Sequence, residues 1–183
     1  VLKLGETFGL RLEISEADSR TSFHRRVQDA VDNGYNTQNP TLYLDAHDKL
    51  IEHCQFALDN VPNRVDRLST STAVEITLDL FRELSRYFET TAPWKLAKGS
   101  DEDKERLKVV LWHAAEALRI GFTLLHPVMP GKMDEALAAL GFTFEESSKE
   151  LAWRTSGTFT LKPIGPLFPR IETKKAEPAA QST

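Results

Sequence analysis

Three long segments of this 183-residue chain carry apolar residues at steps of three and four positions, the spacing of a helix with one buried face. Thr41 is the expected N-cap of the first segment, Thr72 and Glu75 have the spacing of a capping box at the second, and Ser100 precedes the third. Helices of this kind, joined by short connectors, favour an antiparallel bundle, so the sequence predicts an all-α fold. The expected core positions are Leu44, His47, Leu50, Ile51, Cys54, Leu58, Val61, Val65 and Leu68 in the first segment, Val74, Leu78, Phe81, Leu84 and Phe88 in the second, and Leu107, Leu111, Ala114, Leu118, Gly121, Phe122 and Leu125 in the third.

Proline and glycine set the expected boundaries of these helices. Pro62 should kink or split the first helix near Asn60, because proline removes a backbone donor and clashes with the preceding turn. Pro127 ends the third helix, and a short helix over 133–140 stops at Gly141.

The expected organisation has four parts. Residues 1–40 form a partial or diverged N-terminal helix and a connector, 41–141 form the bundle, 142–172 form a C-terminal extended segment, and 173–183 form a disordered polar tail. Two stretches alternate apolar and polar residues, one containing Leu10, Leu12 and Ile14 and the other spanning 157–161, and 23–31 has short helical character.

The charge and apolar content limit the partners that the chain can have. A formal net charge of −4 argues against a bulk electrostatic grip on nucleic acid, so DNA is not expected and RNA recognition would have to be local. No run approaches the 18 apolar residues of a membrane span, so no membrane partner is expected. The single cysteine, Cys54, lies in a helical apolar stripe and is expected to be a buried, inert thiol.

Catalytic signatures are absent from the sequence. It contains neither a glycine-rich phosphate loop nor a Gly-x-Ser-x-Gly elbow. His113 and Glu116 have the spacing of one half of a di-metal bundle site, but no second such pair follows, so no catalytic or metal-binding residue is predicted. A metal-dependent hydrolase using these two residues is the least favoured hypothesis. Glu116 and Arg119 instead have the pattern of a structural ion pair, and His113 and His126 are expected to form hydrogen bonds at helix surfaces.

The segment Thr-Ala-Pro-Trp-Lys-Leu-Ala-Lys, residues 91–98, stands between the second and third helices. Pro93 fixes the backbone there, so Trp94 is held either as a plug in the bundle or as an exposed plate for a nucleic-acid base. Lys95 and Lys98 supply local positive charge beside the ring, as base-stacking sites require.

These residues resemble the anticodon-binding helical domain of methionyl-tRNA synthetases. Residues 92–98 are similar to that family's "APWxLAK" corner, 86–88 to its "NxY[FI]" stretch, 116–130 to its "EalRi…LLxPxMP" helix and 165–172 to its C-terminal "plFPRIe". The ordered matches cover roughly residues 70 to 172, and the "LFPRIE" ending favours the methionine enzyme among related class I synthetases.

The resemblance implies a role for the corner. It implies that Trp94 stacks on an anticodon base of a tRNA, with CAU as the expected anticodon, and that Lys95, Lys98, Arg86 and Arg11 are the accompanying tRNA-binding candidates. The family also reads the anticodon with an Asn and an Arg four residues apart, but the matching region, 4–14, contains only Arg11. A bundle that has lost tRNA reading and acts as a protein-interaction module is therefore the alternative.

The resemblance covers no catalytic domain. The ATP-binding "HIGH" and "KMSKS" motifs of the family are missing, so the chain should not activate methionine alone and should carry no cofactor, ATP belonging to the parent enzyme. It is expected to be the C-terminal part of a bacterial-type or mitochondrial synthetase that works with a catalytic domain in cis or in trans. The expected compartment is the mitochondrial matrix, with the cytoplasm as the alternative. Apolar residues near the C-terminus should be partly exposed without that domain, namely Leu161, Ile164, Leu167 and Phe168.

Overall fold

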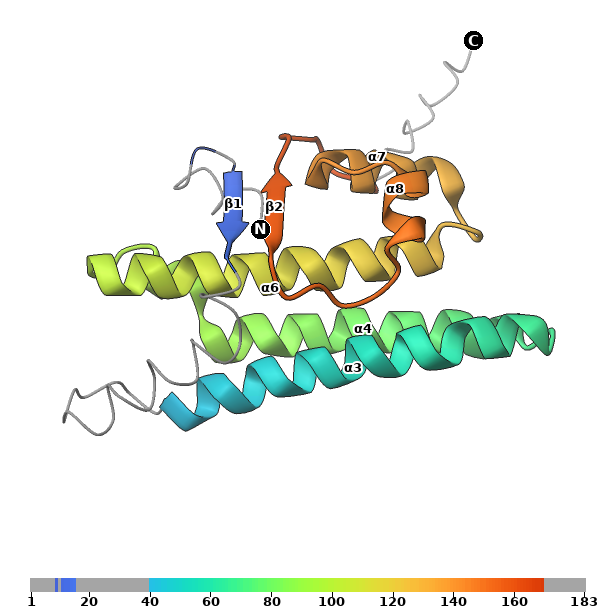
Figure 1. Cartoon of the computed structure of the whole chain (residues 1–183), viewed down its shortest axis with the longest axis horizontal. Coiled ribbons are helices and arrows are strands. Elements are labelled where there is room, and N and C mark those ends of the chain that lie inside the picture. The colour runs from blue at the N-terminus through green and yellow to red at the C-terminus, as the bar shows by residue number, and fades with distance from the viewer. Residues whose placement is uncertain (1–8, 10, 16–39, 170–183) are drawn as a thin grey trace, which may run out of the picture.

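A computed structural model describes residues 9, 11–15 and 40–169 (Figure 1). Predictions that fall on 1–8, 10, 16–39 and 170–183 lie outside the described residues. In the described part no helix is long and apolar enough to cross a membrane. The elements are β1 (Arg11–Ile14), α3 (Pro40–Asp66), α4 (Thr70–Thr91), α5 (Pro93–Leu96), α6 (Asp101–Leu125), α7 (Pro130–Leu140), α8 (Phe144–Lys149) and β2 (Gly157–Thr160).

The helix α6 lies at the centre of the molecule. Figure 1 shows α3 and α4 side by side on one side of it, and the two strands with α7 and α8 on the other. Because both sides are covered, α6 is buried around most of its circumference, including polar positions such as Glu116 and Arg119. The predicted helical bundle is confirmed. The helix α6 differs from its prediction, because it is buried on most sides and not along a single apolar face.

The strands β1 and β2 pair antiparallel, with Leu12 opposite Phe159. Both side chains are fully buried, and the indole nitrogen of Trp112 on α6 donates to the carbonyl of Gly157 at 2.9 Å. The alternating stretch at 157–161 is therefore extended, as the expected C-terminal extended segment requires. The N-terminal helix expected within 1–40 is not found at Arg11–Ile14, which form a strand because Leu12 and Ile14 must face the same layer.

The predicted face of α4 is wrong by about one position. Leu78 is 39% exposed, whereas Thr77 and Thr91 are buried. Each threonine hydroxyl donates to the backbone carbonyl four residues earlier, Thr77 to Ala73 at 3.0 Å and Thr91 to Tyr87 at 2.7 Å. With their hydroxyls satisfied, these polar residues fit into the interface, which an apolar pattern does not reveal.

The helix α3 also differs from its prediction. It begins at Pro40 rather than after Thr41, and it runs unbroken through Pro62 to Asp66. Pro62 lies close to the C-terminal end of the helix, where few hydrogen bonds remain to be lost. The expected core positions Val65 and Leu68 are exposed, because they lie at the tip of the α3–α4 pair.

Some of the predicted helix boundaries are confirmed and others are wrong. Ser100 and Asp103 form the capping box of α6, and Gly141 ends α7 in the left-handed conformation. The proposed box of Thr72 and Glu75 is wrong, because α4 already begins at Thr70. The stretch after Gly141, expected to be extended, contains α8, which a capping box of Thr143 and Glu146 begins.

The side chains of Cys54 and His113 are both buried in the core. Cys54 is fully buried, so its predicted burial is confirmed, and this burial raises the pKa of its thiol, as expected for an inert thiol. His113, expected at a helix surface, is instead only 4% exposed and donates from Nδ1 to the carbonyl of Val109 at 2.8 Å. His126 does lie near the surface, where it bonds Asp134 at 3.0 Å.

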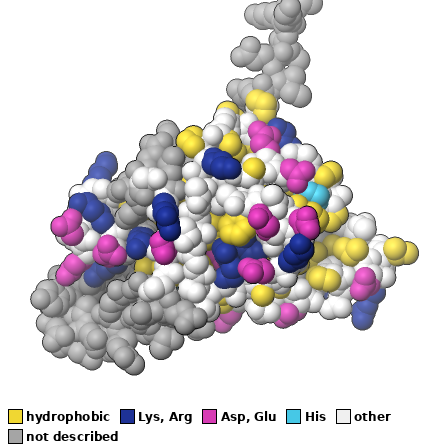
Figure 2. Space-filling view, turned by 45° about the horizontal axis from the view of Figure 1, so that its top comes forward, with side chains coloured by type: hydrophobic (Ala, Val, Ile, Leu, Met, Phe, Trp, Pro, Cys, Tyr) yellow, Lys and Arg dark blue, Asp and Glu magenta, His cyan; other side chains and the backbone are white. Residues whose placement is uncertain are grey.

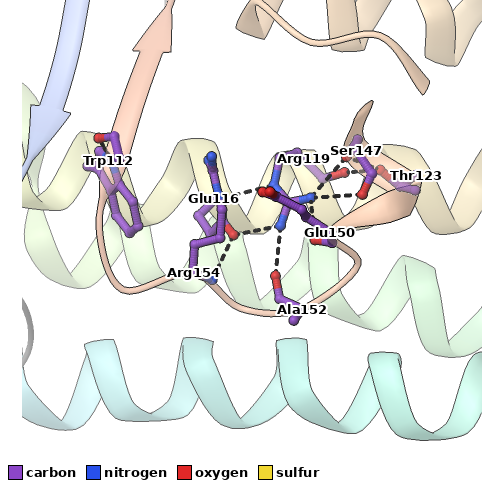
Figure 3. Close-up of polar contacts among 9 residues, drawn as sticks. Trp112, Glu116, Arg119, Thr123, Ser147, Glu150, Ala152 and Arg154 are labelled. Atoms are coloured by element: carbon purple, nitrogen blue, oxygen red, sulfur yellow. Dashed lines mark hydrogen bonds and ion pairs between the residues drawn. The ribbon is translucent and has the colours of Figure 1, made fainter. Parts of the chain in front are cut away.

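A buried charge network joins α6 to the segment that follows α8 (Figure 3). Arg119 donates to both carboxylate oxygens of Glu116, at 2.7 and 3.0 Å, and to the carbonyls of Ser147, Glu150 and Ala152. Arg154 reaches the same carboxylate from the opposite direction, through its backbone N–H and its guanidinium at 2.8 to 3.0 Å. Burial would raise the pKa of Glu116, but the two arginines outweigh it and hold that pKa below its ordinary value.

We expect Glu116→Gln to destabilise the fold by about 3 to 5 kcal/mol, because it leaves the buried guanidinium of Arg119 and the partly buried one of Arg154 without their counter-charge. Urea unfolding followed by circular dichroism measures the loss. The matched control is Asp79→Asn, which breaks the exposed pair with Arg82 and should cost less than about 1 kcal/mol. Equal losses in the two variants would show that the network does not hold the fold together.

The stability should also fall as the pH is lowered from about 6.5 to about 4. Burial lowers the pKa of His113 to about 4, so between these values the unfolded chain binds a proton that the folded chain does not. The contribution is complete above the unfolded pKa and decreases by about 1.4 kcal/mol per pH unit within the window. Replacing His113 with Phe should flatten this part of the unfolding free energy against pH, whereas an unchanged slope would assign it to other groups.

Candidate nucleic-acid interface

The corner between α4 and α6 is built around a change of direction at Ala92. Thr91 ends α4, and Ala92 has φ 43° and ψ 56°, the left-handed conformation. Its N–H donates to the carbonyl of Phe88 at 2.9 Å, and its own carbonyl accepts from the N–H of Lys95 at 2.8 Å. One residue therefore closes α4 and starts α5.

The short helix α5 separates its anchors from its exposed residues. Pro93 and Leu96 are buried, Leu96 being 6% exposed, and α5 packs against α6. Trp94 and Lys95 point outward, and the tryptophan is 51% exposed. Within the described part of the chain, Trp94 makes no ring contact and Lys95 no ion pair. The ring is thus an exposed plate and not a plug within the bundle.

The loop after α5 is fixed by its connection to α6. The backbone N–H groups of Lys98 and Gly99 donate to the carbonyls of Lys95 and Leu96, each at 3.1 Å. A side chain at Gly99 would meet Asp103 at 2.1 Å, so the glycine lets the capping box close. Lys98 is exposed and, among the described residues, forms no ion pair.

The remaining predicted site residues lie apart from this turn. Arg86 is about two turns back on α4, where its guanidinium pairs with the buried Glu83 at 3.0 Å. Arg11 belongs to β1, on the side of α6 away from α4, and pairs with Glu13 at 3.2 Å. The structure therefore gathers Trp94, Lys95 and Lys98, and leaves Arg11 and Arg86 with acidic partners on separate elements.

The charges around the corner are balanced. The first turn of α6 is acidic, and Lys104 and Arg106 pair with Asp101 and Asp103 at 2.8 and 3.7 Å. Figure 2 likewise shows Lys and Arg side chains intermixed with Asp and Glu over one face of the molecule. Among the described residues, an anionic ligand would therefore meet Lys95 and Lys98, which form no ion pair, beside the ring of Trp94, within a surface of mixed charge.

Metal chemistry finds no support in the described residues, where no group of three His, Cys, Asp or Glu side chains could hold an ion. Both oxygens of Glu116 are occupied by arginines, and His113 is enclosed among aromatic rings. These contacts give the hydrolase hypothesis on His113 and Glu116 no support.

The chain is similar to methionine–tRNA ligases. It is 36% identical over 120 residues to the enzyme of Deinococcus radiodurans, a match that covers 65% of this chain and 18% of the relative. It is 27% identical over 177 residues to methionine–tRNA ligase 1 of Bacillus anthracis, covering 91% of this chain and 26% of the relative. No model of a known protein family matches it.

A solved structure agrees with the sequence matches. The free-state methionyl-tRNA synthetase of Mycobacterium tuberculosis superposes with a TM-score of 0.65 at 27% identity, over 70% of this chain and 26% of that one. The chain is therefore homologous to part of methionyl-tRNA synthetases and has the fold of that part. It spans about a fifth to a quarter of the length of the relatives it matches.

We expect Trp94→Ala to change the free energy of unfolding by less than about 1 kcal/mol, because the ring is half exposed. Leu96→Ala, two positions along the same short helix, should cost about 2 to 5 kcal/mol, because it opens a cavity against α6. Urea unfolding of both variants measures these losses and so distinguishes an exposed Trp94 ring from one that is packed in the bundle. Comparable losses would mean that the indole ring packs as the leucine does.

Proposed function

We propose that this chain is the anticodon-binding part of a methionyl-tRNA synthetase and that Trp94 stacks on an unpaired base of a CAU anticodon. The observation that carries the proposal is the ring of Trp94, exposed on a turn whose anchors, Pro93 and Leu96, are buried. The homology adds support, because it connects the chain to enzymes named for their action on tRNA. The alternative, a protein-interaction module, gains no support from the homology.

Stacking is the interaction that this corner is suited to supply. The bases of a single-stranded loop can be unstacked onto an aromatic face, and each such contact contributes about 1 to 3 kcal/mol. A ring that the protein already holds in place avoids part of the ordering cost of binding. Stacking alone accepts any base, so discrimination of CAU requires further hydrogen bonds to base edges.

Lys95 and Lys98 are proposed to neutralise phosphates beside the stacked base. Both ammonium groups are exposed, and within the described residues neither has an acidic partner that an incoming phosphate would have to displace. Arg86 would first have to leave Glu83, and Arg11 would have to leave Glu13, so these arginines are weaker contributors. Methionylation itself is proposed to need a catalytic unit, in cis or in trans.

A short RNA hairpin that presents CAU in its loop tests the proposal. Trp94→Ala should weaken its binding by about 1 to 3 kcal/mol, roughly 5- to 150-fold, with unchanged circular dichroism. The matched control is Phe56→Ala, which removes an aromatic residue of similar exposure, 56%, from α3 and should leave the affinity unchanged. The affinities are measured by fluorescence anisotropy at several salt concentrations.

Two further results bear on the same proposal. Lys95→Gln and Lys98→Gln should each lower the slope of log affinity against log salt by about 0.7, the value for one phosphate of a single strand. A hairpin with a changed loop should bind more weakly than the CAU hairpin. Equal affinities for the two loops at every salt concentration would exclude anticodon reading.

A further inference from the structure

Ala92 has a backbone conformation that its sequence context disfavours twice. Its φ of 43° lies in the left-handed region, where a Cβ atom crowds the following carbonyl. It also precedes Pro93, and a residue before proline is pushed towards extended conformations, far from the ψ of 56° found here. Among the described residues other than glycine, only Leu68, with φ 58°, shares a positive φ.

The surroundings of Ala92 hold it in this conformation. Thr91 before it is fully buried and Pro93 after it is buried, so neither neighbour can rotate outward. The hydrogen bonds to Phe88 and from Lys95 fix both peptide groups of the residue. Because the chain turns within one residue, the next turn directs Pro93 and Leu96 inward and the ring of Trp94 into solvent.

A glycine would adopt the same turn with less strain, but it would also allow other conformations at this point. Strained backbone persists where the surrounding structure over-determines it, and such positions cluster at binding sites. We propose that Ala92 is a positioning residue that holds the indole plate of Trp94 in its binding orientation before a single-stranded RNA base arrives. This proposal rests on the proposed function of Trp94 and adds the means by which the ring is preorganised.

The test compares Ala92→Gly with Leu68→Gly. Leu68 is 88% exposed at the α3–α4 turn, so its replacement relieves similar strain at a position remote from the corner along the chain. Both variants should keep or raise the melting temperature. Ala92→Gly should weaken binding of the CAU hairpin about two- to fivefold, the factor expected from added backbone freedom, and Leu68→Gly should not change it. Unchanged affinity in Ala92→Gly, or an equal loss in Leu68→Gly, would overturn the proposal.

A second measurement needs no RNA. In protein labelled with 5-fluorotryptophan, the ¹⁹F resonance of Trp94 is assigned as the one lost in Trp94→Phe. Ala92→Gly should move this resonance towards that of the free amino acid, while the signals of the buried Trp112 and of Trp153 stay in place. An unmoved resonance would overturn the positioning role. If Trp94→Ala bound the CAU hairpin as tightly as the unchanged protein, the proposed function of Trp94 would be wrong. Failure of the positioning role of Ala92 can therefore be told apart from failure of the proposed function.

Discussion

The carboxylate of Glu116 is the contact on which the arrangement of the second layer depends. It lies on the central helix and accepts from Arg119 of the same helix and from Arg154, 38 positions further along. Arg119 in turn donates to the carbonyl of Ser147 within α8 and to two carbonyls after it, those of Glu150 and Ala152, so α8 and the stretch that follows it are held to α6 by charge-assisted bonds. Arg154 also lies over the rings of Phe142 and Phe159, at 4.9 Å from each centroid, which connects the network to the strand layer.

A fixed α6 has consequences for the corner at its N-terminal end. The turn that carries Trp94 is anchored through Pro93 and Leu96, and α5 packs on α6. The loop between them is closed by the Ser100 and Asp103 capping box, which leaves room only for glycine at position 99. The ring is therefore presented by a short segment between two long helices, and the backbone that carries it is fixed by the ends of those helices.

Sequence reasoning succeeded for several local signals. Ser100, Gly141 and the pair Glu116–Arg119 each act within one helical turn, and all three were predicted correctly. Two local signals were misread, since Thr72 and Glu75 form no capping box and the box of Thr143 and Glu146 was not foreseen. The other misses involve distant partners or polar groups whose hydrogen bonds the sequence does not show: Arg154 completes the network from another segment, and the buried Thr77 and Thr91 each donate to a carbonyl one turn away. At Arg11–Ile14 the structure has a strand within the region where an N-terminal helix and connector were expected, because Leu12 and Ile14 are buried on the same face. The exposure of Trp94 was predicted only through the family resemblance, because a Pro-Trp corner by itself permits either orientation until the left-handed turn at Ala92 is known.

The charge balance determines what kind of RNA contact this corner could make under the proposed function. With a net charge of −4 and acidic residues in the first turn of α6, long-range attraction of a polyanion is weak. One stacked base and two phosphates would give only a modest affinity, which suits a contact that works together with others on the same tRNA. The chain matches only about a fifth to a quarter of each relative, and linkage to a second binding unit would turn the loop contact into an intramolecular step. In that setting a loosely held ring would lose discrimination as well as affinity, because a mobile plate can follow a wrongly placed base. A strained but rigid turn before Trp94 is the feature that such a weak, selective contact requires.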